Sequence, residues 1–217
     1  MVFASSALVC RAGYRPTGET DYCPTTPYGE SKVEMEILVR ESTLIPCPWA
    51  MVRPTSIWGP RFGVPYKNFF STVASGYYFH PGRHDVRRSF GYVGNAVYEL
   101  DKLMFADAPS VHGKTFYLAD YEPVAVRDWA NLIQRAVGAR PVRTIPVRLL
   151  GAIAVAGDIA KACGWASPPL TTFRLHNMLT SAVLDLEPLR AVVGPLPYGL
   201  EEAVGQTVAW MREHGDL

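Results

Sequence analysis

The sequence has no block of like charge, no pair of cysteines at C-x-x-C spacing and no apolar run long enough to cross a bilayer. Its 21 basic and 20 acidic side chains give a net charge of +1, so we expect neither a nucleic-acid nor a membrane partner. The cysteines at positions 10, 23, 47 and 163 are scattered, and none has a histidine at zinc-ligand spacing. We therefore expect reduced thiols in a cytoplasmic protein, and no metal site.

The two most apolar segments also lack the features of exported or membrane-spanning chains. Residues 1–10 carry no basic residue before their short apolar run, so we interpret them as containing a buried strand and not a signal peptide. Residues 149–157 are too few to span a bilayer and are followed by Asp158 and Lys161. They predict a packed helix.

The first 60 residues have the pattern of a strand, a helix and a second strand. A short apolar run at 2–5 ends in small residues, and a loop rich in Gly, Pro and Thr follows at 11–27. Apolar residues interleaved with charges predict a helix at 28–41, and 49–57 is again strand-like before Gly59-Pro60 stops it. Strand, helix and strand with short connections form the βαβ unit of a parallel sheet, so we expect an α/β fold.

Beyond residue 60 the pattern is mixed and shows neither an internal repeat nor a long linker. We predict extended segments at 88–93 and 114–119, and helices at 66–75, 94–106, 126–137, 147–163, 187–193 and 200–213.

Tyr28 and Lys32 are the first candidates for chemistry. Their spacing of four on a helix puts both side chains on one face, one turn apart. An ammonium near a phenol stabilises the phenolate, which makes Tyr28 a candidate acid/base for moving a proton on or off an alcohol. The same spacing also occurs on the solvent-exposed face of ordinary amphipathic helices, so the catalytic interpretation of Tyr28 and Lys32 needs support from other segments.

Two further segments follow the predicted strands. Ser5 and Ser6 end the first strand, and ligands of open parallel sheets bind beyond the carboxyl ends of strands. A hydroxyl there can hold a substrate oxygen, although a serine pair at a strand end is usually only a turn. The second segment, VRPTSIWGP at 52–60, places Pro54 at a strand end and turns sharply at Gly59-Pro60, which also fits an edge strand and its turn.

Taken together and in order, these segments resemble a known family. FASSALVC, TPYGESK and VRPTSIWGP are similar to motifs of the extended short-chain dehydrogenase/reductases, the NAD(P)-dependent nucleotide-sugar epimerase/dehydratase family. RRSFGYVGN at 87–95 and PLPYGLEEAVGQTVAW at 195–210 resemble two later motifs, so the likeness covers nearly the whole chain. The resemblance implies the C-terminal part of a Rossmann-type doubly wound parallel sheet at 1–60, and a smaller α+β substrate-binding region at 61–217 with elements returning to the sheet.

The resemblance assigns roles to particular positions. Ser6 matches the substrate-orienting hydroxyl, Tyr28 the catalytic acid/base, and Lys32 the residue that holds the nicotinamide ribose of NAD or NADP. The segment Pro54, Thr55 and Ser56 matches the nicotinamide side of the site, with Ser56 also facing substrate. Arg88 matches an arginine that often binds the diphosphate of a nucleotide sugar; a surface arginine on a strand is the alternative.

Departures from the family pattern narrow the reaction. Ala7 and Leu8 stand where the 4,6-dehydratases have an acidic pair, which disfavours water elimination, and Leu8 is not the cysteine of epimerase–reductases. Ser56 and Asn95 replace a frequent Asn and Asp. Simple epimerisation or alcohol/ketone redox remains.

The largest departure is that no G-x-x-G-x-x-G occurs, although dinucleotide binding depends on such a turn after the first strand. We therefore expect either a fragment of a longer gene product or a shortened relative that has lost full cofactor binding, inactive by itself in both cases. For the full-length form we expect a homo-oligomer. Two alternatives stay open: a non-catalytic binding or sensing protein of the same fold, and a ketone/alcohol reductase of the steroid or flavonol type.

Overall fold

A three-stranded parallel sheet organises the first half of the fold in the computed structural model, which describes residues 1–217. Strands β1 (Val2–Ala4), β2 (Ala50–Pro54) and β7 (Thr115–Leu118) lie in the order β1-β2-β7. Central β2 is buried over its first four residues, as expected for a parallel strand that is covered on both faces. The parallel sheet predicted from the sequence is confirmed.

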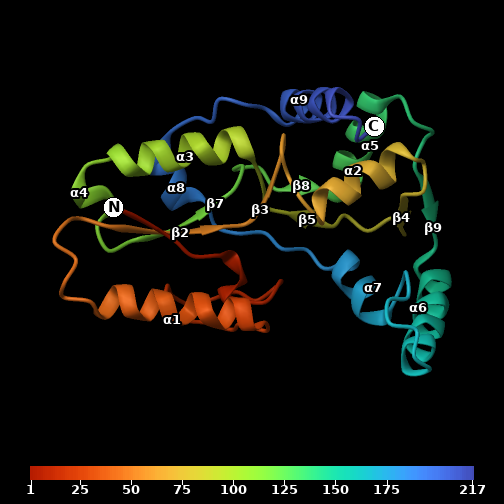
Figure 1. The fold of residues 1–217 in the computed structure, drawn as a ribbon, viewed down its shortest axis with the longest axis horizontal. Helices are drawn as coiled ribbons and strands as arrows, with labels where there is room; N and C mark the ends of the chain where they lie inside the picture. The colour runs from red at the N-terminus through yellow and green to blue at the C-terminus, as the bar shows by residue number, and fades with distance from the viewer.

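Helices cover both faces of this sheet. Helix α1 (Pro27–Glu41) lies along one face, while α3 (Val93–Phe105) and α8 (Glu187–Val193) lie on the other (Figure 1). Successive β2 side chains point to opposite faces, so Met51 packs beneath α1 whereas Val52 packs against α3 and α8. This is the doubly wound arrangement that the sequence predicts.

An aromatic core holds the second part of the chain together. Trp58 and Trp129 are both buried, with ring centroids 5.2 Å apart, between helices α2 (Tyr66–Ala74), α5 (Val126–Val137) and α9 (Leu200–Glu213). Three two-stranded sheets border it: β3 (Ser56–Trp58) with β6 (Phe90–Tyr92), β5 (Arg87–Arg88) with β8 (Val124–Ala125), and β4 (Phe79–Pro81) with β9 (Arg143–Ile145). Two short helices, η1 (Ala7–Val9) and α4 (Ala108–Val111), complete the elements outside the α6–α7 region.

The single strand predicted at 49–57 is wrong, because β2 and β3 belong to different sheets. Pro54 has no N–H to donate. Thr55 gives both its N–H and its hydroxyl to the carbonyl of Leu118, at 3.1 and 3.0 Å, and Ser56 then begins the pairing with β6. The extended segment predicted at 88–93 divides in a similar way, since β5 pairs antiparallel with β8 whereas β6 pairs with β3.

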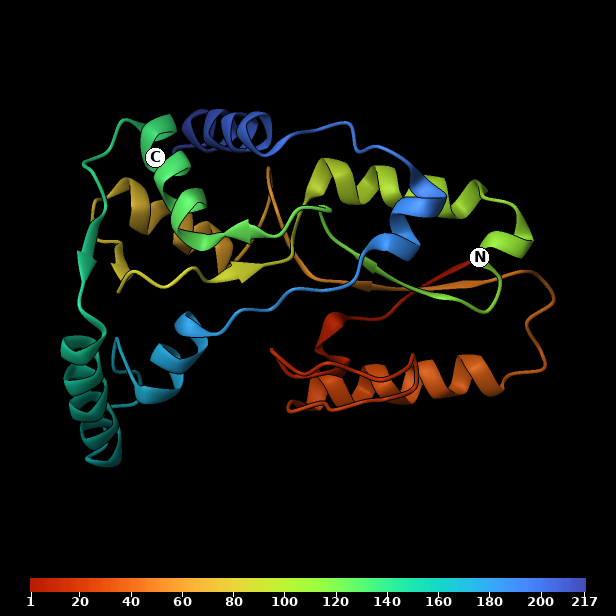
Figure 2. The same ribbon diagram turned by 180° about the vertical axis from the view of Figure 1, so that it is seen from behind.

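Helices α6 (Val147–Ala162) and α7 (Thr172–Leu179) pack together and project from one corner of the molecule (Figures 1 and 2). Four buried residues form a small core of their own there: Leu150, Ala154, Leu170 and Leu175. The sequence predicts α6 but not α7, because α7 is too short to show a helical period. Thr171 marks the start of α7, since its hydroxyl accepts from the N–H of Arg174 at 3.2 Å. None of the helices combines the length and apolarity needed to span a membrane.

Candidate functional site

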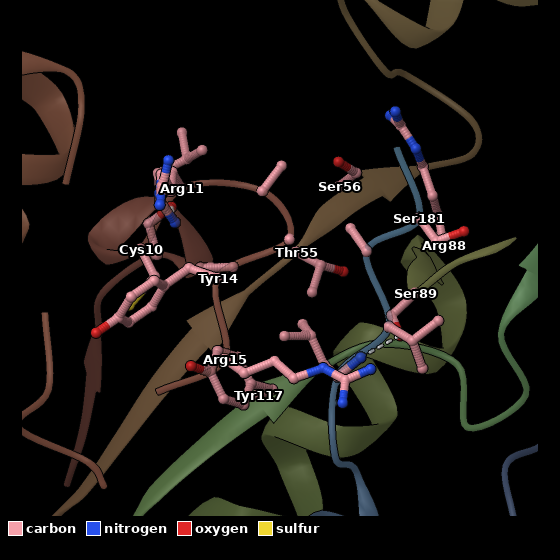
Figure 3. A pocket seen from close by; sticks show the side chains of 18 of the residues that line it. Cys10, Arg11, Tyr14, Arg15, Thr55, Ser56, Arg88, Ser89, Tyr117 and Ser181 are labelled. Atoms are coloured by element: carbon pink, nitrogen blue, oxygen red, sulfur yellow. Dashed lines mark hydrogen bonds between the residues drawn. The ribbon is translucent and has the colours of Figure 1, made fainter. Parts of the chain in front are cut away.

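A cavity of about 380 Å³ opens beyond the carboxyl ends of β1 and β2 (Figure 3). Its walls come from five parts of the chain: the β1 end with the loop after it, the β2–β3 junction, β5 and β6, β7, and the segment before α8. The residues that line it are Ser6, Ala7, Leu8, Cys10, Arg11, Ala12, Gly13, Tyr14, Arg15, Pro16, Pro54, Thr55, Ser56, Arg88, Ser89, Phe90, Tyr117, Ser181, Ala182, Val183 and Leu184. Parallel sheets bind their ligands at this edge.

Ser5 and Ser6 follow directly after β1, and their side chains make different contacts. The Ser5 hydroxyl donates to the Glu36 carboxylate of α1 at 2.5 Å, so it is directed into the interior. Ser6 lines the cavity, and its hydroxyl oxygen accepts from the N–H of Leu8 at 3.1 Å as the N-cap of η1. Of the two serines, Ser6 is therefore the one that can meet a ligand.

Tyr28 and Lys32 lie on the first turns of α1, which Thr26 caps by accepting from the N–H of Gly29 at 3.0 Å. The Lys32 ammonium is 5.7 Å from the centroid of the Tyr28 ring and donates to the Ala4 carbonyl at 2.9 Å. This bond ties the start of α1 to the end of β1, two residues before Ser6. Tyr28 is 52% exposed, and neither it nor Lys32 lines the cavity that Ser6 lines.

Gly29 explains how closely α1 approaches η1. A Cβ at this position would lie 2.4 Å from the backbone carbonyl oxygen of Leu8, a distance that no side chain tolerates. The glycine beside Tyr28 therefore sets the spacing between the helix that carries Tyr28 and Lys32 and the turn that carries Ser6.

Pro54, Thr55 and Ser56 all line the cavity, where the chain passes from the main sheet into β3. The bonds from Thr55 to the Leu118 carbonyl hold this junction against β7. Ser6 and this junction thus come together, as the sequence predicts for the ends of neighbouring parallel strands.

Arg88 lines the same cavity and also a second one of about 310 Å³. One of its guanidinium nitrogens donates to the carbonyls of Asn177 and Thr180, at the end of α7, and its Nε is buried without a partner. Burial lowers the pKa of the guanidinium. In Figure 3 the Arg88 side chain lies beside Ser56 and extends away from Tyr14 and Tyr117. Part of its hydrogen-bonding capacity therefore serves the fold.

The loop residues Arg11, Tyr14 and Arg15 line the cavity opposite Arg88, and no motif in the sequence marks them as site residues. The Tyr14 hydroxyl donates to the Asp21 carboxylate at 2.8 Å, a hydrogen bond that raises the pKa of the tyrosine. The sequence did offer one signal for these residues: Arg11 and Arg15 both lie within ten residues of Ser6, at the end of a strand. The cavity lining includes three arginines and no aspartate or glutamate, so it favours an anionic ligand.

Asn95, where the family pattern often has Asp, is buried away from the cavity. Its amide donates to Asp120 at 2.8 Å and to the Tyr198 carbonyl at 3.0 Å, and its oxygen accepts from the N–H of Tyr198 at 3.1 Å. Asn95 therefore joins α3 to the segment before α9, which is a structural role.

Similar proteins bear on the fold. No family model matches the sequence. An uncharacterized protein of Sinorhizobium fredii, y4nL, is 26% identical over 219 aligned positions, which cover 93% of this chain and 58% of that protein. The UDP-glucose 4-epimerase of Thermotoga maritima, solved with UDP-glucose, superposes with a TM-score of 0.66 at 19% identity over 98% of this chain and 63% of its own.

The UDP-glucuronic acid 4-epimerase of Bacillus cereus, solved with NAD, superposes with a TM-score of 0.67 at 12% identity, over 98% of this chain and 61% of its own. This chain has the epimerase fold. The chain spans about three-fifths of the length of these proteins. At such identities the likeness shows the epimerase fold alone, and the resemblance noted in the sequence is confirmed at that level.

The residues present fit one end of a nicotinamide dinucleotide. The Pro54–Ser56 junction lines the cavity, whereas Lys32, which the resemblance assigns to the nicotinamide ribose, does not. The sequence also has no glycine-rich turn to receive the pyrophosphate on backbone amides. The acid-free lining with its three arginines suits a diphosphate on the substrate side.

Proposed function

We propose that this chain carries the proton-transfer residues and the substrate cavity of an NAD(P)-dependent epimerase or oxidoreductase that acts on a nucleotide sugar. One observation carries the proposal. The cavity beyond the carboxyl ends of β1 and β2 is lined by three arginines and by no aspartate or glutamate, and it lies next to the helix that holds Tyr28 and Lys32. A cation-lined cavity complements the diphosphate of a nucleotide sugar, and a phenol beside an ammonium suits proton transfer to and from an alcohol.

Each residue then has one task. Ser6 hydrogen-bonds the reacting sugar oxygen, Tyr28 takes the proton of the alcohol and returns it, and Lys32 holds the ribose next to Tyr28. When bound, a nicotinamide cofactor would supply the hydride acceptor and donor for the sugar carbon, which Ser6 and Tyr28 would hold through its oxygen. Arg11, Arg15 and Arg88 bind the diphosphate.

Binding measurements test the two halves of this proposal separately. Because the residues present fit the nicotinamide-ribose end, we expect nicotinamide mononucleotide to bind within a few-fold of NAD+, and AMP not to compete with either. Lys32→Ala should abolish that binding, whereas Tyr28→Phe should leave it intact. Tight NAD+ binding that AMP competes away would show that the adenosine end is held and would overturn this part.

On the substrate side, calorimetry with UDP-glucose should show binding that Arg11→Gln/Arg15→Gln weakens at least tenfold. Arg61→Gln, a substitution of an exposed arginine outside the cavity, is the matched control. No binding, or equal loss from the control, would contradict the diphosphate assignment.

We expect no turnover of UDP-glucose by this chain alone with NAD+; an epimerised product in the NMR spectrum would contradict that expectation.

A non-catalytic binding role is the second candidate, and the placement of Tyr28 favours it. Tyr28 is half exposed and lies outside the lining of the cavity. Under this alternative, UDP-glucose binds but the nicotinamide mononucleotide neither binds nor changes its affinity. The same two titrations therefore separate the candidates. Homo-oligomer formation, a cytoplasmic location and the reductase alternative stay predictions.

A further inference from the structure

Helix α6 is apolar on two faces, of which the chain covers one. Leu150 and Ala154 are buried in the small core against α7. Leu149 and Ile159, on the opposite side, are 54% and 60% exposed, and no residue from 149 to 157 is charged. A helix that is apolar all round normally lies in a protein core or in lipid, so the outer face of α6 lacks a partner within this chain.

The exposed residues form a continuous stripe. Positions 149, 152, 153, 156 and 159 hold Leu, Ala, Ile, Ala and Ile at spacings of three and four, which puts them on one side of the helix. Trp165 directly after α6 and Phe173 on α7 are also exposed, at 57% and 72%. Aromatic residues of this kind are enriched at membrane–water interfaces. The projecting position of α6 and α7 leaves them accessible (Figure 2).

Charge is segregated onto the same part of the chain. Residues 140–180 hold five basic residues and one acidic residue, a net charge of +4, whereas the other 16 basic and 19 acidic residues give −3. The single acid, Asp158, accepts from the N–H of Thr172 at 3.3 Å and from its hydroxyl at 2.5 Å, so it is used between α6 and α7. The overall charge of +1 hides this separation, which is why the sequence favours no membrane partner.

We propose that α6 and α7, with the loop between them, form an interfacial anchor that docks on an anionic lipid surface. An apolar stripe bordered by cations is the pattern of helices that lie in the plane of a membrane interface. A second copy of this chain is disfavoured as the occupant, because α6, α7 and the loop between them hold three basic residues and one acidic residue, and two such units of net charge +2 would repel each other. Anionic lipid headgroups complement the same charge. This inference is independent of the proposed reaction.

Co-sedimentation of the 217-residue chain with phosphatidylcholine vesicles containing phosphatidylglycerol tests the anchor, with a lipid-free spin to exclude aggregation. We expect binding to these vesicles, little binding to pure phosphatidylcholine, and a blue shift of tryptophan emission that Trp165→Phe removes. Trp49, Trp58 and Trp129 are buried and should contribute little to the shift. Ile153→Glu/Ile159→Glu should lower the bound fraction at least tenfold.

Leu44→Glu is the matched control, because Leu44 is an exposed apolar residue outside α6, α7 and the loop between them, and its loss should leave binding unchanged. If the double glutamate variant unfolds, Arg148→Gln/Lys161→Gln supplies a second test and should weaken binding in a salt-dependent way. Equal binding to both vesicle types, or equal binding by these variants, would overturn the proposal. So would lipid-free dimers that Ile153→Glu/Ile159→Glu disperses, since they would make a second copy the occupant.

Discussion

Arg53 of β2 and Glu36 of α1 form an ion pair that is almost wholly buried, with Arg53 Nη2 2.7 Å from Glu36 Oε2 and Arg53 Nε 2.8 Å from Oε1. The carboxylate also accepts from the hydroxyls of Ser5 at 2.5 Å and Tyr22 at 3.0 Å. The pair therefore joins α1, which carries Tyr28 and Lys32, to the ends of β1 and β2, next to Ser6 and Pro54.

Glu36→Ala should lower the free energy of unfolding by about 3–5 kcal/mol, because it leaves the Arg53 charge buried without a counter-charge. Urea unfolding measures the change. Asp85→Ala, which removes an exposed ion pair with Arg87, is the control and should cost less than about 1 kcal/mol. A cost for Glu36→Ala as small as that of the control would show that water reaches Arg53.

The same pair predicts a dependence on acid. Burial opposes the charge of Glu36, but hydrogen bonds from Arg53 and Ser5 outweigh it and lower the pKa of the carboxyl. A carboxyl with a lowered folded pKa contributes stability that is present above its unfolded pKa and is lost as pH falls through the folded pKa. The difference in stability between the native chain and Glu36→Ala should therefore shrink at acid pH.

Glu99 of α3 predicts the opposite trend. Both of its carboxyl oxygens are buried without a hydrogen-bond partner, and burial, with a smaller effect of the Asp120 charge, raises its pKa to about 9. A raised pKa means that stability falls as pH rises from the unfolded pKa through the folded one. Glu99→Gln should therefore stabilise the chain by about 3 kcal/mol at neutral pH.

Urea unfolding as a function of pH checks this, with Glu201→Gln, at an exposed position, as control. The gain from Glu99→Gln should be small below the unfolded pKa and should grow with pH. A gain that does not vary with pH would mean that Glu99 is ionised in the folded state.

Two glycines of α6 form a matched pair. A Cβ at Gly157 would lie 1.9 Å from the backbone carbonyl oxygen of Leu170, whereas a Cβ at Gly151 meets nothing within 4 Å. Gly157→Ala should push α6 away from the following loop and cost about 1–3 kcal/mol. Gly151→Ala should stabilise by about 0.5–1 kcal/mol, because alanine loses less backbone entropy on folding. Thermal unfolding of both variants should show shifts of opposite sign.

Arg88 should affect both stability and ligand binding. Arg88→Ala removes the donor to the Asn177 and Thr180 carbonyls, so we expect a loss of about 1–3 kcal/mol in the free energy of unfolding. In a full-length protein of this fold it should also weaken nucleotide-sugar binding far more than NAD(P) binding. Arg87→Ala, at the exposed neighbouring residue, is the control and should change neither. Equal loss of both ligands would make the role of Arg88 structural only.

Local pattern predicted most elements of this fold, since a buried strand or an amphipathic helix shows its period in its own residues. The helices at α1, α3, α5 and α9 begin within one residue of the predicted positions. The site was predicted less completely. Ser6 and the Pro54–Ser56 junction do meet at one cavity, but Arg11 and Arg15 went unnoticed because their loop has no periodic pattern. Their position depends on the packing of the loop against distant parts of the chain.

The sequence by itself determined the α/β class, the positions of most helices, and the spacing that puts Tyr28 and Lys32 on one helical face, because these follow from neighbours along the chain. Only the tertiary structure decided that the chain leaves one sheet at Thr55 and enters another, since β-pairing joins residues far apart in sequence. Only the tertiary structure showed that Tyr28 lies outside the lining of the cavity, and that one apolar face of α6 is exposed. The reason is that amino-acid composition is an average over the whole chain, whereas a ligand or a membrane would contact only the side chains that folding brings together on one surface.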